Sequence, residues 1–170
     1  VGVGEALPFE DASLDVVIYS NSLHHVAIEN IRTGLAEAAR VLKPGGLLYV
    51  MEPVAKGGFF DVQSMWNDET EVRSRAYEEV EGSGDLGLEA AGEFFYGYAR
   101  RARDFDHFVE IMSQCNPKNR GVITELGDAV RRRFEEVAAR DGDEFALDMT
   151  FRINMRRKTA KHDDSSQRRG

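Results

Sequence analysis

The chain has 170 residues, of which 42% are hydrophobic, so it is long enough for one domain with an apolar core. Its formal net charge is −8 at pH 7, and an acidic chain without a basic stripe is not built like a nucleic-acid-binding protein. The single cysteine, Cys115, excludes an internal disulfide and fits a reducing, cytoplasmic compartment, and no apolar run has the length of a membrane span.

The first elements follow a strand–helix–strand pattern. The apolar run LDVVIY at residues 14–19 is rich in β-branched residues and predicts a strand buried on both faces of a parallel sheet. Apolar residues then recur at spacings of three and four over residues 28–42, which predicts an amphipathic helix. KPGG at 43–46 is expected to end this helix, and LLYVME at 47–52 predicts a second buried strand.

The middle of the chain predicts three helices, a joint and a strand. Residues 67–81 begin with capping residues and acids, and a helix is expected there. The glycine-rich segment 82–87 predicts a flexible joint, and the aromatic segment 93–102 predicts a strand. Asp104 is placed to cap a short helix, and one longer helix is expected to carry the apolar residues of 123–137.

The last part of the chain changes period. Apolar and polar residues alternate over residues 145–155, which predicts a long, half-buried strand of antiparallel type. Residues 158–170 lack apolar anchors and are expected to be disordered. Cys115 is expected to be a buried apolar residue without a redox role.

The glycines Gly2 and Gly4 raise the question of a nucleotide-binding loop. Such a loop needs a strand before it and a helix directly after it. Here the turn EDAS and the strand at 14–19 follow instead. The context therefore argues against a phosphate-binding loop.

The same stretch belongs to a longer pattern, GEALPFEDASLDVVIYSNSLHHV at residues 4–26 followed by LAEAARVLKPGGLLYVMEP at residues 35–53. In order and spacing this pattern resembles class I S-adenosylmethionine (SAM)-dependent methyltransferases of the small-molecule type. The resemblance implies an α/β, Rossmann-like fold with a mixed sheet and an antiparallel carboxyl-terminal strand. In that family the sheet order is 3-2-1-4-5-7-6, and this chain matches the fourth to seventh strands.

The resemblance also implies an amino-terminal truncation. The family's glycine-rich SAM loop has no counterpart in this sequence, and we expect it to lie upstream of Val1. Residues 1–157 are then part of a methyltransferase domain, and residues 158–170 are its tail. With the neighbouring strand missing, residues 15–20 become an exposed sheet edge, which favours self-association.

The resemblance further implies which residues bind the cofactor. Those placed along the adenine ring are Gly4, Glu5 and Ala6. Many members carry an aspartate at the position of Val3, and valine cannot accept the hydrogen bond that aspartate takes. Asn21 and Ser22 follow a strand at the carboxyl edge of the sheet, where ligands bind in open α/β folds, and Asn21 matches a position that contacts the methionine part of SAM.

His24 and His25 are the candidate catalytic residues. Either could line the acceptor pocket or act as a general base, although an ordinary structural histidine is the alternative. Neighbours on regular structure point in different directions, and the other histidines offer no ligand spacing, so no metal is predicted. Glu52 ends the second strand at the same edge and is a further pocket candidate.

The middle segment also offers side chains that could close a substrate pocket. They are Met65 and three aromatic residues, Trp66, Tyr96 and Tyr98, although aromatic residues at such positions more often belong to a core.

The sequence therefore predicts an enzyme that transfers a methyl group from S-adenosyl-L-methionine to a small-molecule acceptor, with no nucleic-acid or membrane partner. The alternative is a truncated, inactive module that acts at most in protein interaction. An NAD-dependent oxidoreductase is a third hypothesis, against which LPFEDASLDVV argues.

Overall fold

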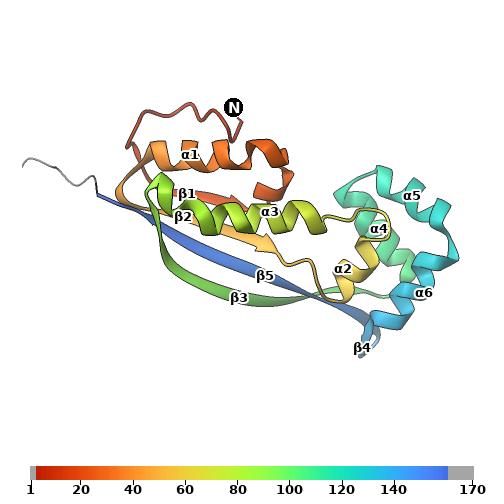
Figure 1. Cartoon of the computed structure of the whole chain (residues 1–170). Coiled ribbons are helices and arrows are strands. Elements are labelled where there is room, and N and C mark those ends of the chain that lie inside the picture. The colour runs from red at the N-terminus through yellow and green to blue at the C-terminus, as the bar shows by residue number, and fades with distance from the viewer. Residues whose placement is uncertain (1–2, 161–170) are drawn as a thin grey trace, which may run out of the picture. The chain divides into compact units, whose positions relative to one another are not determined.

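The computed structural model describes residues 3–160, which combine strands and helices (Figure 1). The strands are β1 (Leu14–Ser20), β2 (Leu42–Pro53), β3 (Leu88–Ala102), β4 (Ala139–Asp141) and β5 (Glu144–Lys158). The α-helices are α1 (Ile31–Val41), α2 (Gly58–Gln63), α3 (Thr70–Glu81), α4 (Phe105–Cys115), α5 (Lys118–Leu126) and α6 (Asp128–Val137). Three 3-10 turns are η1 (Leu23–His25), η2 (Ile28–Asn30) and η3 (Gly82–Leu86). Within the described residues, no helix has the length and apolar character needed to span a membrane.

The five strands form one mixed sheet. β1 pairs parallel with β2, and Ser20 lies opposite Met51 at the carboxyl ends of the two strands. The strand order is β1-β2-β5-β3, with β4 paired to β5 in an antiparallel hairpin. In Figure 1, β5 lies beside β2 and runs in the opposite direction. The predicted mixed sheet with an antiparallel carboxyl-terminal strand is therefore confirmed, and the order is the one the family gives to its fourth, fifth, seventh and sixth strands.

The chain divides into two compact units. The first unit contains Val1–Glu52, Arg75–Phe94 and Ile153–Gly170, and the second contains Pro53–Ser74 and Phe95–Arg152. The long strands β3 and β5 contribute to both units, because each crosses a boundary. The assignment of residues 1–157 to one partial methyltransferase domain stays a prediction.

The strand β1 is an edge strand with one exposed face, so the prediction that both faces are buried is wrong. Tyr19 is 8% exposed and donates a hydrogen bond from its hydroxyl to the Gly34 carbonyl of α1 (3.2 Å). On the other face, Val16 and Ile18 are 47% and 62% exposed. The physical reason is that β1 has one neighbouring strand and is covered by α1 on one side (Figure 1).

The junction between α1 and β2 is tighter than the sequence predicts. The helix ends at Val41, and Leu42 already pairs with Leu14 of β1. Residues 43–46 bulge out opposite Asp15, because pairing resumes with Leu47 opposite Val16. Two features of the KPGG segment allow this: Gly45 has a φ of +80°, and the Gly46 Cα lies so close to backbone carbonyls that an added Cβ would sit 2.9 Å from the Lys43 oxygen.

The second unit has its own aromatic core. Its buried apolar residues are Phe59, Val62, Ala102, Phe105, Phe108, Met112, Ile123, Val130, Phe134, Leu147 and Met149. The ring of Phe134 lies between those of Phe108 and Phe145, with centroid distances of 5.1 and 5.2 Å. Asp104 caps α4 as predicted, since its Oδ1 accepts the His107 N–H (2.8 Å).

Two sequence expectations for the second unit are wrong. The single long helix expected over residues 123–137 is two helices, α5 and α6, which meet at Gly127. Gly127 has a φ of +57°, a conformation outside the right-handed helical region, so the helix cannot continue through it. Cys115 is exposed and not buried, because it ends α4 beside the exposed Asn116.

In the first unit, the structure also differs from the flexible joint predicted at residues 82–87 and from the start of the disordered tail predicted at residues 158–170. Residues 82–86 form η3, where Arg32 of α1 hydrogen-bonds the Gly82 carbonyl and pairs with Asp85. In the predicted disordered tail 158–170, Lys158 ends β5 and the Thr159 N–H donates to the Gly87 carbonyl (2.9 Å). Residues 161–170 of that prediction lie outside the described part of the chain.

Candidate functional site

The carboxyl ends of β1 and β2 carry the polar residues of the candidate site. Asn21 follows β1, and its N–H donates to the Met51 carbonyl of β2 (2.7 Å). The chain then turns sharply, because Asn21 has a φ of +52°, a conformation that asparagine tolerates better than most residues. The turn places Ser22 and η1 next to Glu52 on the adjacent strand.

The Glu52 carboxylate binds three donors of this segment. Its Oε1 accepts the N–H of Ser22 (3.0 Å) and the N–H of Leu23 (2.7 Å). Its Oε2 pairs with the Nδ1 of His24. A single side chain on β2 thus satisfies the first backbone donors of η1 and orients one of the two candidate histidines.

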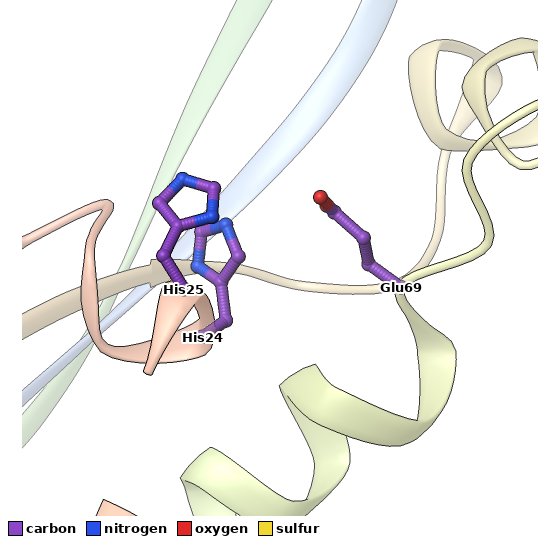
Figure 2. Close-up of side chains that lie close together, drawn as sticks. All are labelled: His24, His25 and Glu69. Atoms are coloured by element: carbon purple, nitrogen blue, oxygen red, sulfur yellow. The ribbon is translucent and has the colours of Figure 1, made fainter. Parts of the chain in front are cut away.

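The two histidines differ in burial although they are neighbours in η1. His24 is 5% exposed, whereas His25 is exposed. Their rings lie side by side in Figure 2, with centroids 4.1 Å apart and planes inclined by 49°. The prediction that the rings point in different directions is therefore wrong, because the tight 3-10 turn brings the adjacent side chains together.

Glu69, which Figure 2 also labels, has its own hydrogen bonds in the second unit. Its carboxylate pairs with Arg73 (2.5 Å) and accepts from the Asn67 side chain (2.9 Å). Arg73 in turn stacks over the ring of Phe60, 5.1 Å from its centroid. These contacts fix Glu69 at the start of α3.

The segment Gly4–Ala6 forms a turn beside α1. The Ala6 N–H donates to the Val3 carbonyl (3.1 Å), which closes the turn. The Glu5 carboxylate accepts from the Asn30 side chain (3.5 Å). Burial raises the pKa of Tyr19 to about 12, and the negative charges of Glu5 and Glu37 add to this effect. The Tyr19 hydroxyl is therefore neutral, and it lies close to the turn, since a Cβ added at Gly4 would be 3.5 Å from its oxygen. Gly2 lies outside the described residues.

The segment after this turn is held by Glu37 and Arg40 of α1. The Leu7 N–H donates to Glu37 Oε2 (3.0 Å), and Arg40 donates to the Leu7 carbonyl (3.1 Å). Arg40 also reaches the Phe9 carbonyl (2.9 Å) and Asp11 (2.7 Å). Hydrogen bonds from Arg40 and from the Leu7 N–H lower the pKa of Glu37 to about 2.

This network is a positioning device that the sequence reasoning missed. The acid and the base sit three residues apart on one helix, which by itself indicates an ordinary surface pair. Their reach to the segment 7–11 follows only from the fold. In the same unit, the Asp15 carboxylate at the start of β1 pairs with Lys43 at 2.9 Å.

The structure brings together only part of the predicted site. Asn21, Ser22, His24 and His25 lie in one continuous turn around Glu52. Between this turn and residues 3–6, the described residues form no hydrogen bond or ion pair. Of the proposed pocket aromatics, Tyr96 and Tyr98 are 54% and 45% exposed on β3, and Trp66 packs edge-on against Phe108 in the second unit.

Residues 1–50 match the family described as Methyltransferase domain. Among curated proteins, an uncharacterized protein of Escherichia coli K12, YafE, is 40% identical over 65 residues, which are 38% of this chain and 30% of that protein. The demethylmenaquinone methyltransferase of Corynebacterium efficiens is 52% identical over 52 residues, or 31% of this chain and 22% of the relative. The chain thus spans less than a third of these curated relatives.

Solved structures resemble the chain over nearly its whole length. The YcgJ protein of Bacillus subtilis matches with a TM-score of 0.55 and 18% identity, covering 94% of this chain and 70% of its own. The 4+2 cyclase SpnF matches with a TM-score of 0.52 and 22% identity, covering 94% of this chain and 54% of its own. At such identities the likeness shows the Rossmann-like fold alone.

Proposed function

We propose, from the match of residues 1–50 to the family described as Methyltransferase domain, that this protein is a SAM-dependent methyltransferase acting on a small molecule. The observation that carries the proposal is the polar turn at the carboxyl edge of β1 and β2, which lies where ligands bind in open α/β sheets. A cytoplasmic location and the lack of a nucleic-acid partner remain parts of the proposal, supported by the single cysteine and the net charge of −8.

The residues of the turn fit the methionine part of SAM through side chains and not through backbone groups. Glu52 already binds the N–H groups of Ser22 and Leu23, so neither is free for a ligand. The side chains of Asn21 and Ser22 form no hydrogen bond within residues 3–160, and Asn21 is exposed. We infer that Asn21 holds the polar end of the cofactor, with Ser22 beside it.

On the adenine side, the fit rests on the backbone of Gly4 and Glu5. The Ala6 N–H is already used by Val3, and Ala6 therefore lines the ring without donating to it. The position of Val3 carries no acceptor for the adenine amino group. The acidic group of this turn is the Glu5 carboxylate, which lies 3.5 Å from the Asn30 amide nitrogen.

The proposed reaction needs a positioned acceptor more than it needs a strong catalyst. Bound SAM supplies a methyl carbon whose bond to sulfur breaks as the acceptor's new bond forms, leaving S-adenosylhomocysteine. Correct positioning supplies much of the rate in such a displacement. His24 and His25 lie next to Asn21 and Ser22, where one of them can take the proton that the acceptor group releases.

Calorimetric titration of SAM into the 170-residue chain tests this proposal. A dissociation constant on the order of micromolar that rises about tenfold or more in Asn21→Gly supports it. Glycine retains the positive φ at this position, so this variant removes the amide without straining the turn. The matched control is Gln114→Ala, which removes an exposed amide from α4. The proposed site is contradicted if Asn21→Gly and Gln114→Ala have the same dissociation constant for SAM, or if the wild-type chain shows no heat of binding.

The second candidate function is an interaction module without catalysis, and the exposed edge of β1 favours it. Val16 and Ile18 present apolar surface beside an unpaired strand edge. This proposal expects the chain to self-associate through residues 15–20. Sedimentation should show a dimer or larger species that Ile18→Lys converts to monomer, together with no binding of SAM.

A further inference from the structure

We propose that Glu52 is a positioning residue that fixes His24 with its proton on Nδ1 and its lone pair on Nε2, ready to accept a proton from the methyl acceptor. The inference rests on the proposed function for its chemical purpose. Its structural content stands on the Glu52–His24 pair and the two backbone contacts beside it.

The direction of the Glu52–His24 hydrogen bond follows from the donors around the carboxylate. An ionised carboxylate only accepts hydrogen bonds. Oε1 already faces the two backbone N–H groups of Ser22 and Leu23, at 3.0 and 2.7 Å, which leaves Oε2 for the imidazole. Nδ1 must therefore carry the hydrogen, and in the neutral ring the lone pair is on Nε2.

The burial of the pair makes this orientation persistent. The side chains of His24 and Glu52 are 3% and 14% exposed. The Lys43–Asp15 pair in the same unit has side chains that are 44% and 80% exposed, and pairs of that kind restrain little. Because both partners are sheltered and Glu52 is also tied to the backbone, the imidazole has one favoured ring orientation.

His25 provides an internal contrast to His24. His25 is exposed and its ring centroid lies 4.1 Å from that of His24, but within residues 3–160 the His25 ring forms no hydrogen bond. Nothing on the described chain fixes its tautomer. The geometry thus assigns the role of oriented base to His24 and leaves His25 as a neighbour that limits access to the ring.

The proton balance of the proposed step is simple. As the acceptor atom bonds to the methyl carbon, its hydrogen leaves as a proton and binds the Nε2 lone pair of His24. The resulting imidazolium carries both N–H groups, and Glu52 stabilises its charge through the existing Nδ1 contact. The proton then passes to solvent, which restores the neutral ring.

Long-range 1H–15N correlation spectra of the histidine rings test the assignment directly. They are recorded near pH 8.5, above the ordinary imidazole pKa of about 6.5, and the signals that disappear in His24→Asn are those of His24 among the four histidines of the chain. We expect His24 to show a protonated Nδ1 and an unprotonated Nε2. In Glu52→Gln the amide oxygen must stay on the backbone donors, so the amide N–H₂ faces His24 and the proton should move to Nε2.

The controls separate this inference from the proposed function. Glu78→Gln makes the same change on the exposed side of α3 and should leave the His24 spectrum unchanged. A wild-type His24 protonated on Nε2, or an Nδ1–H signal that survives in Glu52→Gln, overturns the inference. If Glu52→Gln does not fold, the wild-type spectrum alone decides. Loss of SAM binding with the expected tautomer present would remove the proposed function and leave the assignment intact.

Discussion

The two units of the chain are held together by different kinds of contact. In the first unit, charged side chains reach backbone groups about thirty residues away in sequence: Glu52 binds Ser22 and Leu23, and Glu37 binds Leu7. In the second unit, aromatic rings pack on one another around Phe108 and Phe134. Hydrogen bonds are directional and ring packing is far less so.

This difference indicates which unit can position the atoms of a reacting site. A carboxylate that holds backbone donors and an imidazole sets atoms to within a few tenths of an ångström, which a reacting site requires. A core of phenylalanines sets volume and tolerates exchange of similar side chains. We therefore expect substitutions in the second unit to change stability, and substitutions at the sheet edge of the first unit to change binding and tautomer.

The strongest test of the comparison removes a ring from the second unit. Phe134 is fully buried between Phe105, Phe108 and Phe145. Phe134→Ala should lower the free energy of unfolding by about 3–5 kcal/mol, because it leaves a large cavity, as measured by urea denaturation. Phe95→Ala, at a residue that is 58% exposed, should change it by less than about 0.5 kcal/mol. Equal effects would mean that the ring cluster does not stabilise this unit.

The next test concerns the break between α5 and α6. Gly127→Ala should cost about 1–3 kcal/mol, since alanine is strained at a φ of +57°. The matched change Gly121→Ala lies within α5 where an added Cβ meets nothing within 4 Å, and it should stabilise the chain by about 0.5–1 kcal/mol. Thermal unfolding of both variants measures the difference. A stabilising Gly127→Ala would restore the single long helix that the sequence predicts.

The sequence predicted most of the first unit because its elements are periodic and short-range. The strand at 14–19, the helix over 28–42 and the strand at 47–52 correspond to β1, α1 and β2. What it could not predict was how the elements meet. The bulge at residues 43–46 depends on the register between β1 and β2, which no local pattern encodes.

The site shows the same limit. Asn21 and Ser22 could be placed at the sheet edge from their position after a strand, and Glu52 from its position at the end of the next. The sequence left Glu52 as one pocket group among several, because nothing local reveals that its carboxylate holds η1 and His24. In the second unit, hydrophobicity alone suggested a buried Cys115, although the residue lies at the exposed end of α4.

A smaller effect is expected at the contact between β1 and α1. Tyr19→Phe removes the hydroxyl that donates to the Gly34 carbonyl (3.2 Å). Because the Gly34 carbonyl lies inside α1 and keeps its helical hydrogen bond, only the extra bond from the hydroxyl is lost, and the free energy of unfolding should fall by about 0.5–1.5 kcal/mol. Tyr98→Phe, at an exposed tyrosine, is the control and should have no measurable effect. A silent Tyr19→Phe would show that packing alone joins α1 to β1, as it joins the helices of the second unit.

The smallest expected effect is the pH dependence that Glu37 gives the first unit. Hydrogen bonds from Arg40 and the Leu7 N–H hold the pKa of Glu37 at about 2 in the folded chain, below its ordinary value of 4.5. Because the folded state holds the proton more weakly, the stabilisation is complete above about 4.5 and is lost as the pH falls toward 2. Unfolding followed between these values should show a loss of stability that Glu37→Gln reduces and Glu78→Gln does not. In Phe134→Ala, the free energy of unfolding should depend on pH as it does in the wild type, since the core of the second unit consists of rings that do not titrate. If Glu37→Gln leaves this pH dependence unchanged, the Glu37–Arg40 network restrains the segment after Leu7 no better than an exposed surface pair.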